Sequence, residues 1–95
     1  MAETIEVLSP LAHVAVHEAT PAPRPLSLDG LRPGILENRK ANARLLMETM
    51  VERLGERFDL GEMVVGSKPV GGPPSDSTID SLRNGADFLL IGSCD

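Results

Sequence analysis

Asp87-Phe88-Leu89-Leu90-Ile91-Gly92-Ser93-Cys94-Asp95 is the stretch that decides the fold of this chain. Its hydrophobic side chains stand at successive positions, which is typical of a central strand in a parallel sheet covered on both faces. Such sheets carry their reactive groups just past the carboxyl ends of their strands. The only cysteine, Cys94, follows the strand at that place, where the sequence also ends. We therefore expect the chain to be one part of a larger catalytic body that a second protein subunit completes.

Composition narrows the class of protein. The chain has 95 residues, enough for one small domain, and 41% of them are hydrophobic, which suits a globular fold. Only 2% are aromatic and the net charge is −5, so neither a base-stacking platform nor a nucleic-acid footprint is expected. No stretch approaches the ~20 apolar residues of a membrane span, and residues 1–6 do not resemble a signal peptide. A single cysteine cannot form an internal disulfide, which favours the cytoplasm.

The chain divides near residue 28. In the first part, Ile5–Leu8 and Ala12–His17 are short apolar stretches that could form strands, and three prolines then favour an extended linker. We expect an N-terminal arm over residues 1–28 that pairs with a sheet edge or wraps a partner, and a core over residues 29–95. On a strand, His13 and His17 would stand about 13 Å apart, too far to bind one metal ion.

The core predicts a β-α-β-α-β order. Strands are expected at residues 33–37, 62–66 and 86–91, and helices at residues 40–57 and 78–84. Right-handed crossovers would make the strands parallel. The expected fold is thus α/β: a small three-layer parallel sheet that resembles half of a flavodoxin or Rossmann fold, with at least one edge left open.

Apolar periodicity predicts the first helix and the side chains it buries. The stripe consists of Leu46, Met50, Leu54 and Phe58, widened by Met47 and Val51. Asn38 is expected to cap this helix and Gly61 to help end it.

The second helix also carries signals for its start. Ser77 and Asp80 have the spacing of a capping box, and Ser75, Ser77 and Thr78 are expected to cap the helix rather than bind a ligand.

The candidate chemical groups follow the strands. Cys94 is the predicted nucleophile, redox thiol or metal ligand, because a thiolate serves in each of these roles. Its neighbours Ser93 and Asp95 complete the predicted catalytic group; Ser93 could donate to an oxyanion, whereas the charge of Asp95 opposes thiolate formation. An inert, buried cysteine is the alternative.

A second group of residues is predicted to bind a small anion. Asn38, Lys40 and Asn42 follow the first strand, and Lys68 follows the second, so all four should lie at the same edge as Cys94. Ammonium and amide groups near a helix start suit a carboxylate or phosphate. The alternatives are helix capping by Asn38 and plain surface positions for the two lysines. The sequence contains no nucleotide-binding motif. It predicts no particular cofactor; a transition metal bound by Cys94 is the one candidate.

From residue 24 onward the chain resembles the UGSC family, which is named for a selenocysteine-Gly-Ser-Cys motif and is similar to part of glycine reductase selenoprotein B. The resembling pieces are Arg24-Pro25-Leu26-Ser27-Leu28, Gly34-Ile35-Leu36-Glu37-Asn38-Arg39-Lys40-Ala41-Asn42-Ala43, Lys68-Pro69 and Ala86-Asp87-Phe88-Leu89-Leu90-Ile91-Gly92-Ser93-Cys94. The resemblance implies thiol or selenol chemistry akin to a reductase. One register aligns Gly92-Ser93-Cys94 with the family's Gly-Ser-Cys; the other, which we favour, aligns Cys94 with the selenocysteine.

Three functions remain open from the sequence. The first is a subunit of a heteromeric enzyme in which Cys94 acts on a small anionic substrate. The second is a non-catalytic subunit that completes or regulates a partner enzyme. The third is a metal-binding or thiol-carrier module.

Overall fold

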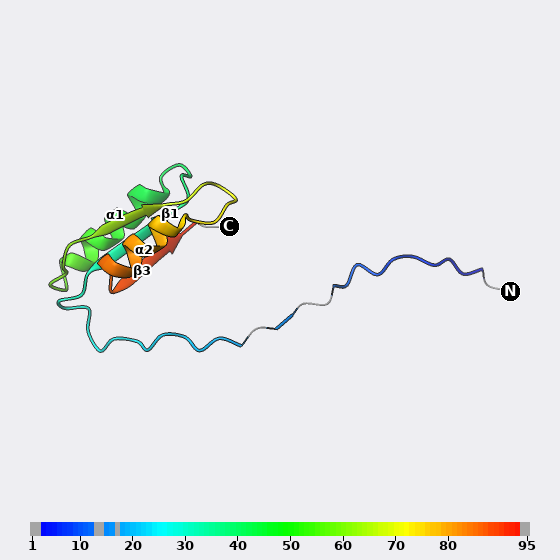
Figure 1. Ribbon diagram of the computed structural model, residues 1–95, viewed down its shortest axis with the longest axis horizontal. Helices are drawn as coiled ribbons and strands as arrows, with labels where there is room; N and C mark the ends of the chain where they lie inside the picture. Colours follow the sequence, from blue (N-terminus) through cyan, green and yellow to red (C-terminus); the bar gives the residue numbers. More distant parts are fainter. Residues whose placement is uncertain (1–2, 13–14, 17, 94–95) are drawn as a thin grey trace.

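The structure, a computed structural model, describes residues 3–12, 15–16 and 18–93. Five regular elements follow one another along the chain (Figure 1). They are β1 (Pro33–Glu37), α1 (Ala43–Gly55), β2 (Val64–Ser67), α2 (Asp76–Gly85) and β3 (Phe88–Gly92). The predicted β-α-β-α-β order is confirmed. β1 has the predicted bounds, and the other elements shift by a few residues.

The three strands form one parallel sheet in the order β2-β1-β3. Glu37 pairs with Ser67 on one side and with Gly92 on the other, so the three strands end together at one edge. Every residue of β1 is buried, whereas the residues of β3 alternate between half-buried and exposed. The prediction of a central strand at the end of the sequence is wrong, because β1 occupies the centre. Within the described residues, β3 pairs with β1 alone.

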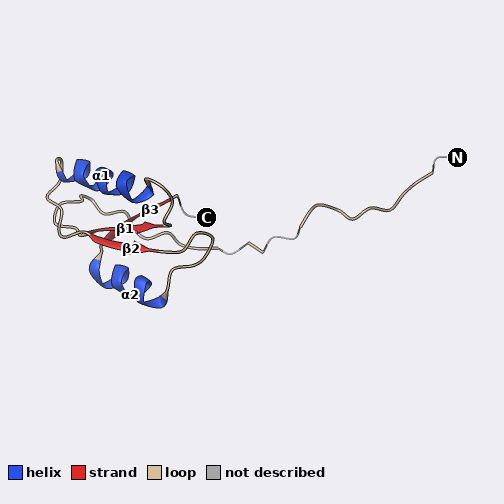
Figure 2. Ribbon diagram, turned by 90° about the horizontal axis from the view of Figure 1, so that it is seen from above, coloured by secondary structure: helices blue, strands red, loops and turns tan. Residues whose placement is uncertain are grey.

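The two helices cover opposite faces of the sheet (Figure 2). Beneath α1, the core contains Ile35 of β1 together with Met47 and Val51 of the helix. On the other face, Leu82 of α2 approaches the backbone of β2: a Cβ added at Gly66 would lie 3.0 Å from Leu82 Cδ1. Glycine in the strand therefore lets α2 pack close to the sheet.

The buried face of α1 differs from the predicted stripe. Met47 and Val51 are 4% and 8% exposed, but Leu46 and Met50 are 62% and 44% exposed. The apolar surface of the helix is wider than the face that one sheet covers. The sheet covers the side that faces β1, and the Leu46–Met50 side remains in solvent.

The predicted ends of α1 are wrong. The helix begins after Asn42, whose backbone is left-handed (φ 64°) and whose side chain makes no capping hydrogen bond. Asn38 is therefore not its cap. The helix ends at Gly55 rather than at residue 57. Gly61 takes no part in ending it, and its N–H donates to the Leu31 carbonyl (2.8 Å).

The start of α2 is capped two residues earlier than the predicted capping box. The Ser75 hydroxyl accepts from the Thr78 N–H (3.3 Å), so Ser75 is the cap rather than Ser77. Asp80 lies 3.9 Å from Arg83 one turn later in the helix. The prediction that this serine-rich start caps the helix is confirmed for Ser75, whereas the predicted capping box of Ser77 and Asp80 is not formed.

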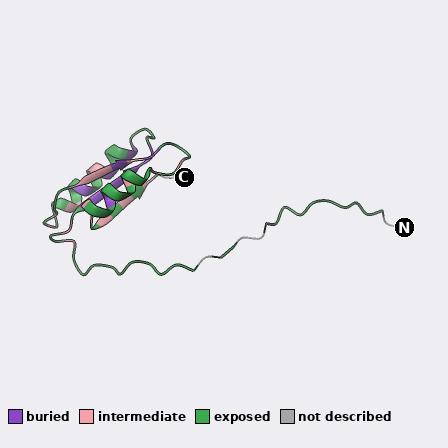
Figure 3. Cartoon of the chain, in the orientation of Figure 1, coloured by how far each residue is buried: buried purple, intermediate pink, exposed green. Residues whose placement is uncertain are grey.

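The described residues before β1 contain no helix or strand, and nearly all of them are exposed (Figure 3). They lead away from the core, so that the described chain measures 74 × 31 × 26 Å. Ile5–Leu8, a predicted strand, pairs with no strand here. His13 and His17 lie outside the described residues. Among the helices described, none is long and apolar enough to cross a membrane.

Candidate functional site

The loops that follow the three strands meet at one edge of the sheet. This edge holds polar side chains although the sheet behind it is apolar. We call this group the carboxyl-edge cluster; its members are Glu37, Asn38, Arg39, Lys40, Ser67, Lys68 and Ser93. Because β1 pairs with both neighbours in register, the cluster forms a continuous row across the end of the sheet.

Two side chains of the first loop converge on the third loop. The Asn38 amide Nδ2 donates to the Ser93 carbonyl oxygen at 2.6 Å, and the Lys40 ammonium lies 3.3 Å from the same oxygen. Asn38 is fully buried, whereas Lys40 is exposed. Together they fix the backbone directly before Cys94 in the sequence and bring a positive charge to it.

The loop between β1 and α1 has an unusual backbone. Arg39 and Asn42 both have positive φ angles, 62° and 64°. Such angles are uncommon outside glycine, and asparagine tolerates them better than arginine does. Arg39 is held in place because its N–H donates to Glu37 Oε2 (2.6 Å) and its Nε to the Ser67 hydroxyl (3.2 Å).

Glu37 is the buried acid of the cluster, and the residue is only 7% exposed. The hydrogen bond from Ser67 lowers the pKa of this carboxyl, and the Arg39 N–H and the charges of Arg44 and Arg39 act in the same direction, against the opposing effect of burial. Glu37 is therefore ionised at neutral pH. It anchors the loop rather than serving as a proton donor.

Lys68 continues β2 into this edge. Its N–H donates to the Glu37 carbonyl (2.9 Å), and its ammonium donates to the Pro69 carbonyl (2.9 Å). The residue is only 5% exposed. The alternative of a plain surface lysine is thus wrong for Lys68, since burial of an ammonium group requires compensation by polar partners.

The predicted site residues fall into three groups. Asn38, Lys40 and Ser93 come into direct contact, and Lys68 lies at the same edge. Asn42 stands at the exposed start of α1, without a capping bond. The predicted catalytic residues Cys94 and Asp95 lie outside the described residues. In the part of the chain that is described, no three His, Cys, Asp or Glu side chains lie together as a metal site would require.

A comparison with protein families bears on this edge. A family model described as the UGSC family matches residues 6–95, nearly the whole chain. The chain belongs to the UGSC family. Comparisons with curated proteins and with solved structures found no match. The family assignment includes the strand and loop that carry Ser93, and it also extends over most of the N-terminal arm.

Sequence reasoning missed the side chains that hold the loop between β1 and α1 in place. Glu37, Arg39 and Ser67 were not among the predicted site residues. One signal was available for Glu37: it is a charged residue at the end of an otherwise apolar strand, a place where parallel sheets carry functional groups. Arg39 and Ser67 carried no such signal, because their contact joins segments 28 residues apart.

Proposed function

We propose that this chain is a subunit of a heteromeric enzyme in which Cys94 acts as a thiol on a small anionic substrate. The observation that supports this most directly is the meeting of Asn38 and Lys40 at the Ser93 carbonyl oxygen. It puts a cation and a rigid loop next to the residue that precedes Cys94. A nearby cation favours the thiolate, which is the reactive form of cysteine.

The order of the strands also favours the carboxyl edge of the sheet as the site. The order β2-β1-β3 is that of the first three strands of flavodoxin-like sheets, which run 2-1-3-4-5. In such sheets the chain reverses its direction of growth between β1 and β3, and ligands bind there, outside the carboxyl ends. Asn38 follows β1 and Ser93 follows β3, so their contact lies at that point. We extend the fold proposal accordingly to half of a flavodoxin- or Rossmann-like domain.

The charge of the cluster favours an anion. Among the described residues of the cluster, Arg39, Lys40 and Lys68 stand against the carboxylate of Glu37, in a chain whose net charge is −5. Lys40 is exposed, so a carboxylate or phosphate in solution can reach its ammonium group. In this proposal Lys40 binds the anion, Asn38 orients the loop, and Ser93 and Asp95 flank the thiol. Lys68 stabilises the edge, and Asn42 contributes at the start of α1.

Membership of the UGSC family suggests the type of reaction. The family motif contains a reactive selenocysteine or cysteine, and its similarity to glycine reductase selenoprotein B suggests redox chemistry. These 95 residues hold one cysteine, so a two-thiol reaction would draw its second thiol from outside them. Nucleophilic attack requires Cys94 alone. A metal at Cys94 would need further ligands, and the described residues hold no group of three His, Cys, Asp or Glu side chains that could bind it without Cys94. A reducing cytoplasm would keep this thiol active.

The exposed edge of the sheet at β3 supports the proposal of a second subunit. Leu89 and Ile91 of β3 are 42% and 60% exposed. An edge strand with apolar side chains is a template for pairing with another strand. A partner that adds strands beside β3 would cover these residues and enclose the carboxyl edge.

Alkylation of Cys94 in the full chain tests the anion site. Iodoacetate and iodoacetamide form the same S–C bond with loss of iodide, but only iodoacetate is an anion. We expect Lys40→Met to lower the ratio of the iodoacetate rate to the iodoacetamide rate about three- to tenfold, as for loss of one partly exposed opposite charge. Arg83→Met in α2 removes a charge elsewhere and should leave the ratio unchanged. An unchanged ratio in Lys40→Met would contradict the proposal.

The alternative is a non-catalytic subunit that completes the fold of a partner enzyme. The same open side of β3 favours it, since this surface requires no chemistry at Cys94. Cys94→Ser separates the two functions: in an active complex it should abolish turnover if the thiol is the nucleophile. Full turnover with a serine there would establish the structural role.

A further inference from the structure

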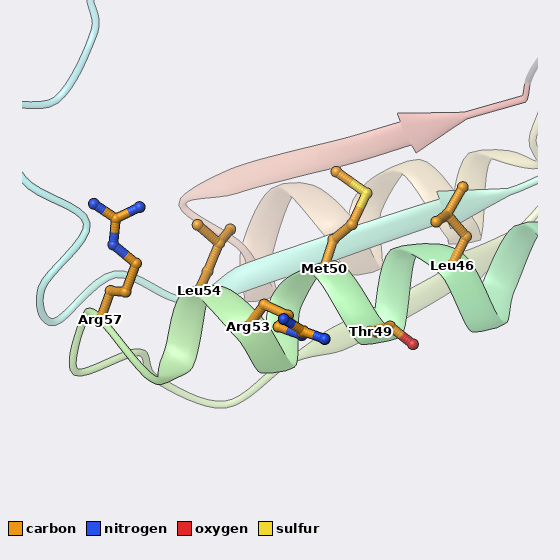
Figure 4. Close-up of a pocket in the computed structure, with 6 residues that line it drawn as sticks. All are labelled: Leu46, Thr49, Met50, Arg53, Leu54 and Arg57. Atoms are coloured by element: carbon orange, nitrogen blue, oxygen red, sulfur yellow. The ribbon is translucent and has the colours of Figure 1, made fainter.

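A groove on α1 lies apart from the carboxyl-edge cluster. It has a volume of about 480 Å³, and its lining residues are Leu46, Thr49, Met50, Arg53, Leu54 and Arg57 (Figure 4). Leu46, Met50 and Leu54 project from the same side of the helix, toward the side of the sheet where β3 lies (Figure 4). This is the apolar stripe that the sequence predicted to be core. It is an apolar surface that the described part of the chain leaves exposed.

The groove has a basic end. Arg53 and Arg57 stand near the end of α1, and Arg57 lies over the Phe58 ring at 6.0 Å. A complementary ligand would combine two or three apolar side chains with a carboxylate at one end. The stripe from Leu46 to Leu54 extends about 12 Å along the helix, so a short extended segment would fill it.

The N-terminal arm contains a segment with these properties. Residues Glu3-Thr4-Ile5-Glu6-Val7-Leu8 alternate so that Glu3, Ile5 and Val7 lie on one face when extended. Ile5 and Val7 are 87% and 74% exposed. No lysine or arginine occurs before Arg24, so this end of the chain is acidic. In an extended chain the distance from Glu3 to Val7 is about 13 Å, which matches the length of the stripe.

The linker directs this segment away from its own groove. Prolines at 21, 23 and 25 fix their own φ angles and restrict the residue before each to extended conformations. The linker runs beside the start of β3, where Pro21–Pro25 and Asp87–Leu89 line a hollow of about 330 Å³. From there the arm continues past the core (Figure 1). The two complementary surfaces therefore belong to one chain but do not meet within it.

We propose that Glu3–Leu8 of one copy docks in the α1 groove of a second copy, and that the exchange is reciprocal. Ile5 and Val7 contact the leucine and methionine side chains, and Glu3 lies at the arginine end. Two equal contacts related by a two-fold axis close the assembly as a dimer. The contact uses no residue of the carboxyl-edge cluster or of β3, so it does not depend on the proposed function.

Sedimentation of the full chain over a range of concentrations tests the dimer. Leu46 and its neighbour Leu45 form a matched pair: they are 62% and 61% exposed, and only Leu46 lines the groove. Leu46→Glu should weaken dimer formation roughly tenfold or more, since it puts a carboxylate into an apolar contact. Leu45→Glu should leave it unchanged. Circular dichroism checks that both variants fold.

A mixing experiment distinguishes exchange between copies from folding back of the arm. Ile5→Asp/Val7→Asp removes the docking segment, and Leu46→Glu removes the groove; each variant alone should be monomeric. Mixed together, they should form a heterodimer through the one intact arm and the one intact groove. The proposal is overturned if the full chain is a monomer at all concentrations, if Leu46→Glu dimerises like the unmodified chain, or if the mixture remains monomeric.

Discussion

At the scale of single residues, Asn38 shows what the sequence could not specify. Its position between a strand and a helix fits a helix cap, an anion ligand or a link to another loop. The structure selects the link: its amide donates to the carbonyl of Ser93, 55 residues away. A local pattern contains no information about that distance. That Asn38 and Ser93 lie at the same edge was predictable because the strands are parallel. Their contact could be known only from the folded structure.

Asn38→Ala should therefore destabilise the chain. It removes the buried donor to the Ser93 carbonyl, which then keeps only the exposed Lys40 ammonium. The expected loss in the free energy of unfolding is that of one hydrogen bond, about 0.5–1.5 kcal/mol. Urea unfolding of the full chain measures it. Asn84→Ala is the control, because Asn84 is exposed and accepts from Arg32 through its backbone carbonyl, which alanine retains. Equal stability of the Asn38 and Asn84 variants would contradict a structural role for the amide.

Asp87 makes the stability depend on pH. The hydrogen bond from the Arg32 side chain, aided by the Arg32 N–H and its charge, lowers the pKa of this carboxyl below its ordinary value of 3.8. The unfolded chain thus takes up the proton at a higher pH than the folded chain. The ionised carboxylate stabilises the fold above the ordinary pKa, and this contribution is lost as the pH falls through the folded-state pKa.

Asp87→Asn should accordingly lower the Tm at neutral pH, and its difference from the unmodified chain should shrink in acid. Thermal unfolding at a series of pH values measures both. Asp80→Asn removes a carboxylate from an exposed pair with Arg83 at 3.9 Å and should change little at any pH. A difference for Asp87→Asn that is constant with pH would show that the carboxylate charge is not involved.

At the scale of elements, α1 shows which properties of a helix can be predicted from apolar periodicity and which cannot. The recurrence of apolar residues predicted the helix correctly, because its period is a property of the segment itself. It did not predict which side is buried: Met47 faces the sheet and Leu46 does not. That choice depends on which strands lie beneath the helix. The helix ends were also missed, since Asn42 starts α1 through its backbone angle and makes no side-chain cap.

The approach of α2 to the sheet predicts opposite effects for two glycines. A Cβ at Gly34 would collide with Leu89 Cδ2 and lie 2.7 Å from Ala86 Cβ. Gly34→Ala should lower the free energy of unfolding by about 1–3 kcal/mol, because the packed side chains must move. At Gly55, the last residue of α1, a Cβ meets nothing within 4 Å.

Gly55→Ala is thus the matched control, and it should leave stability unchanged or raise it by up to about 1 kcal/mol. Both changes are measured by denaturant unfolding. If both variants lost the same stability, the loss would reflect the removal of glycine itself and not close packing of α2.

At the scale of the whole molecule, the chain presents three separate surfaces. The carboxyl-edge cluster gathers cations, the α1 groove is apolar and basic, and the outer side of β3 is apolar. Such surfaces are costly to expose on a chain with so small a core. Different residues line the three surfaces, so each surface can be altered by a substitution that leaves the residues of the others unchanged.

Ile91→Lys tests the β3 side. Ile91 is 60% exposed, so the substitution should change the stability of the chain itself by no more than about 0.5 kcal/mol. A lysine on an edge strand opposes pairing with another strand. We expect the proposed partner subunit to co-purify from the natural host with the tagged unmodified chain and not with this variant. Ile79→Lys on α2, at 37% exposure, should retain the partner. Neither isoleucine lines the α1 groove, so both variants should still form the arm-exchanged dimer. Retention of the partner by Ile91→Lys would place the heteromeric contact on another face and remove the argument for strand addition beside β3.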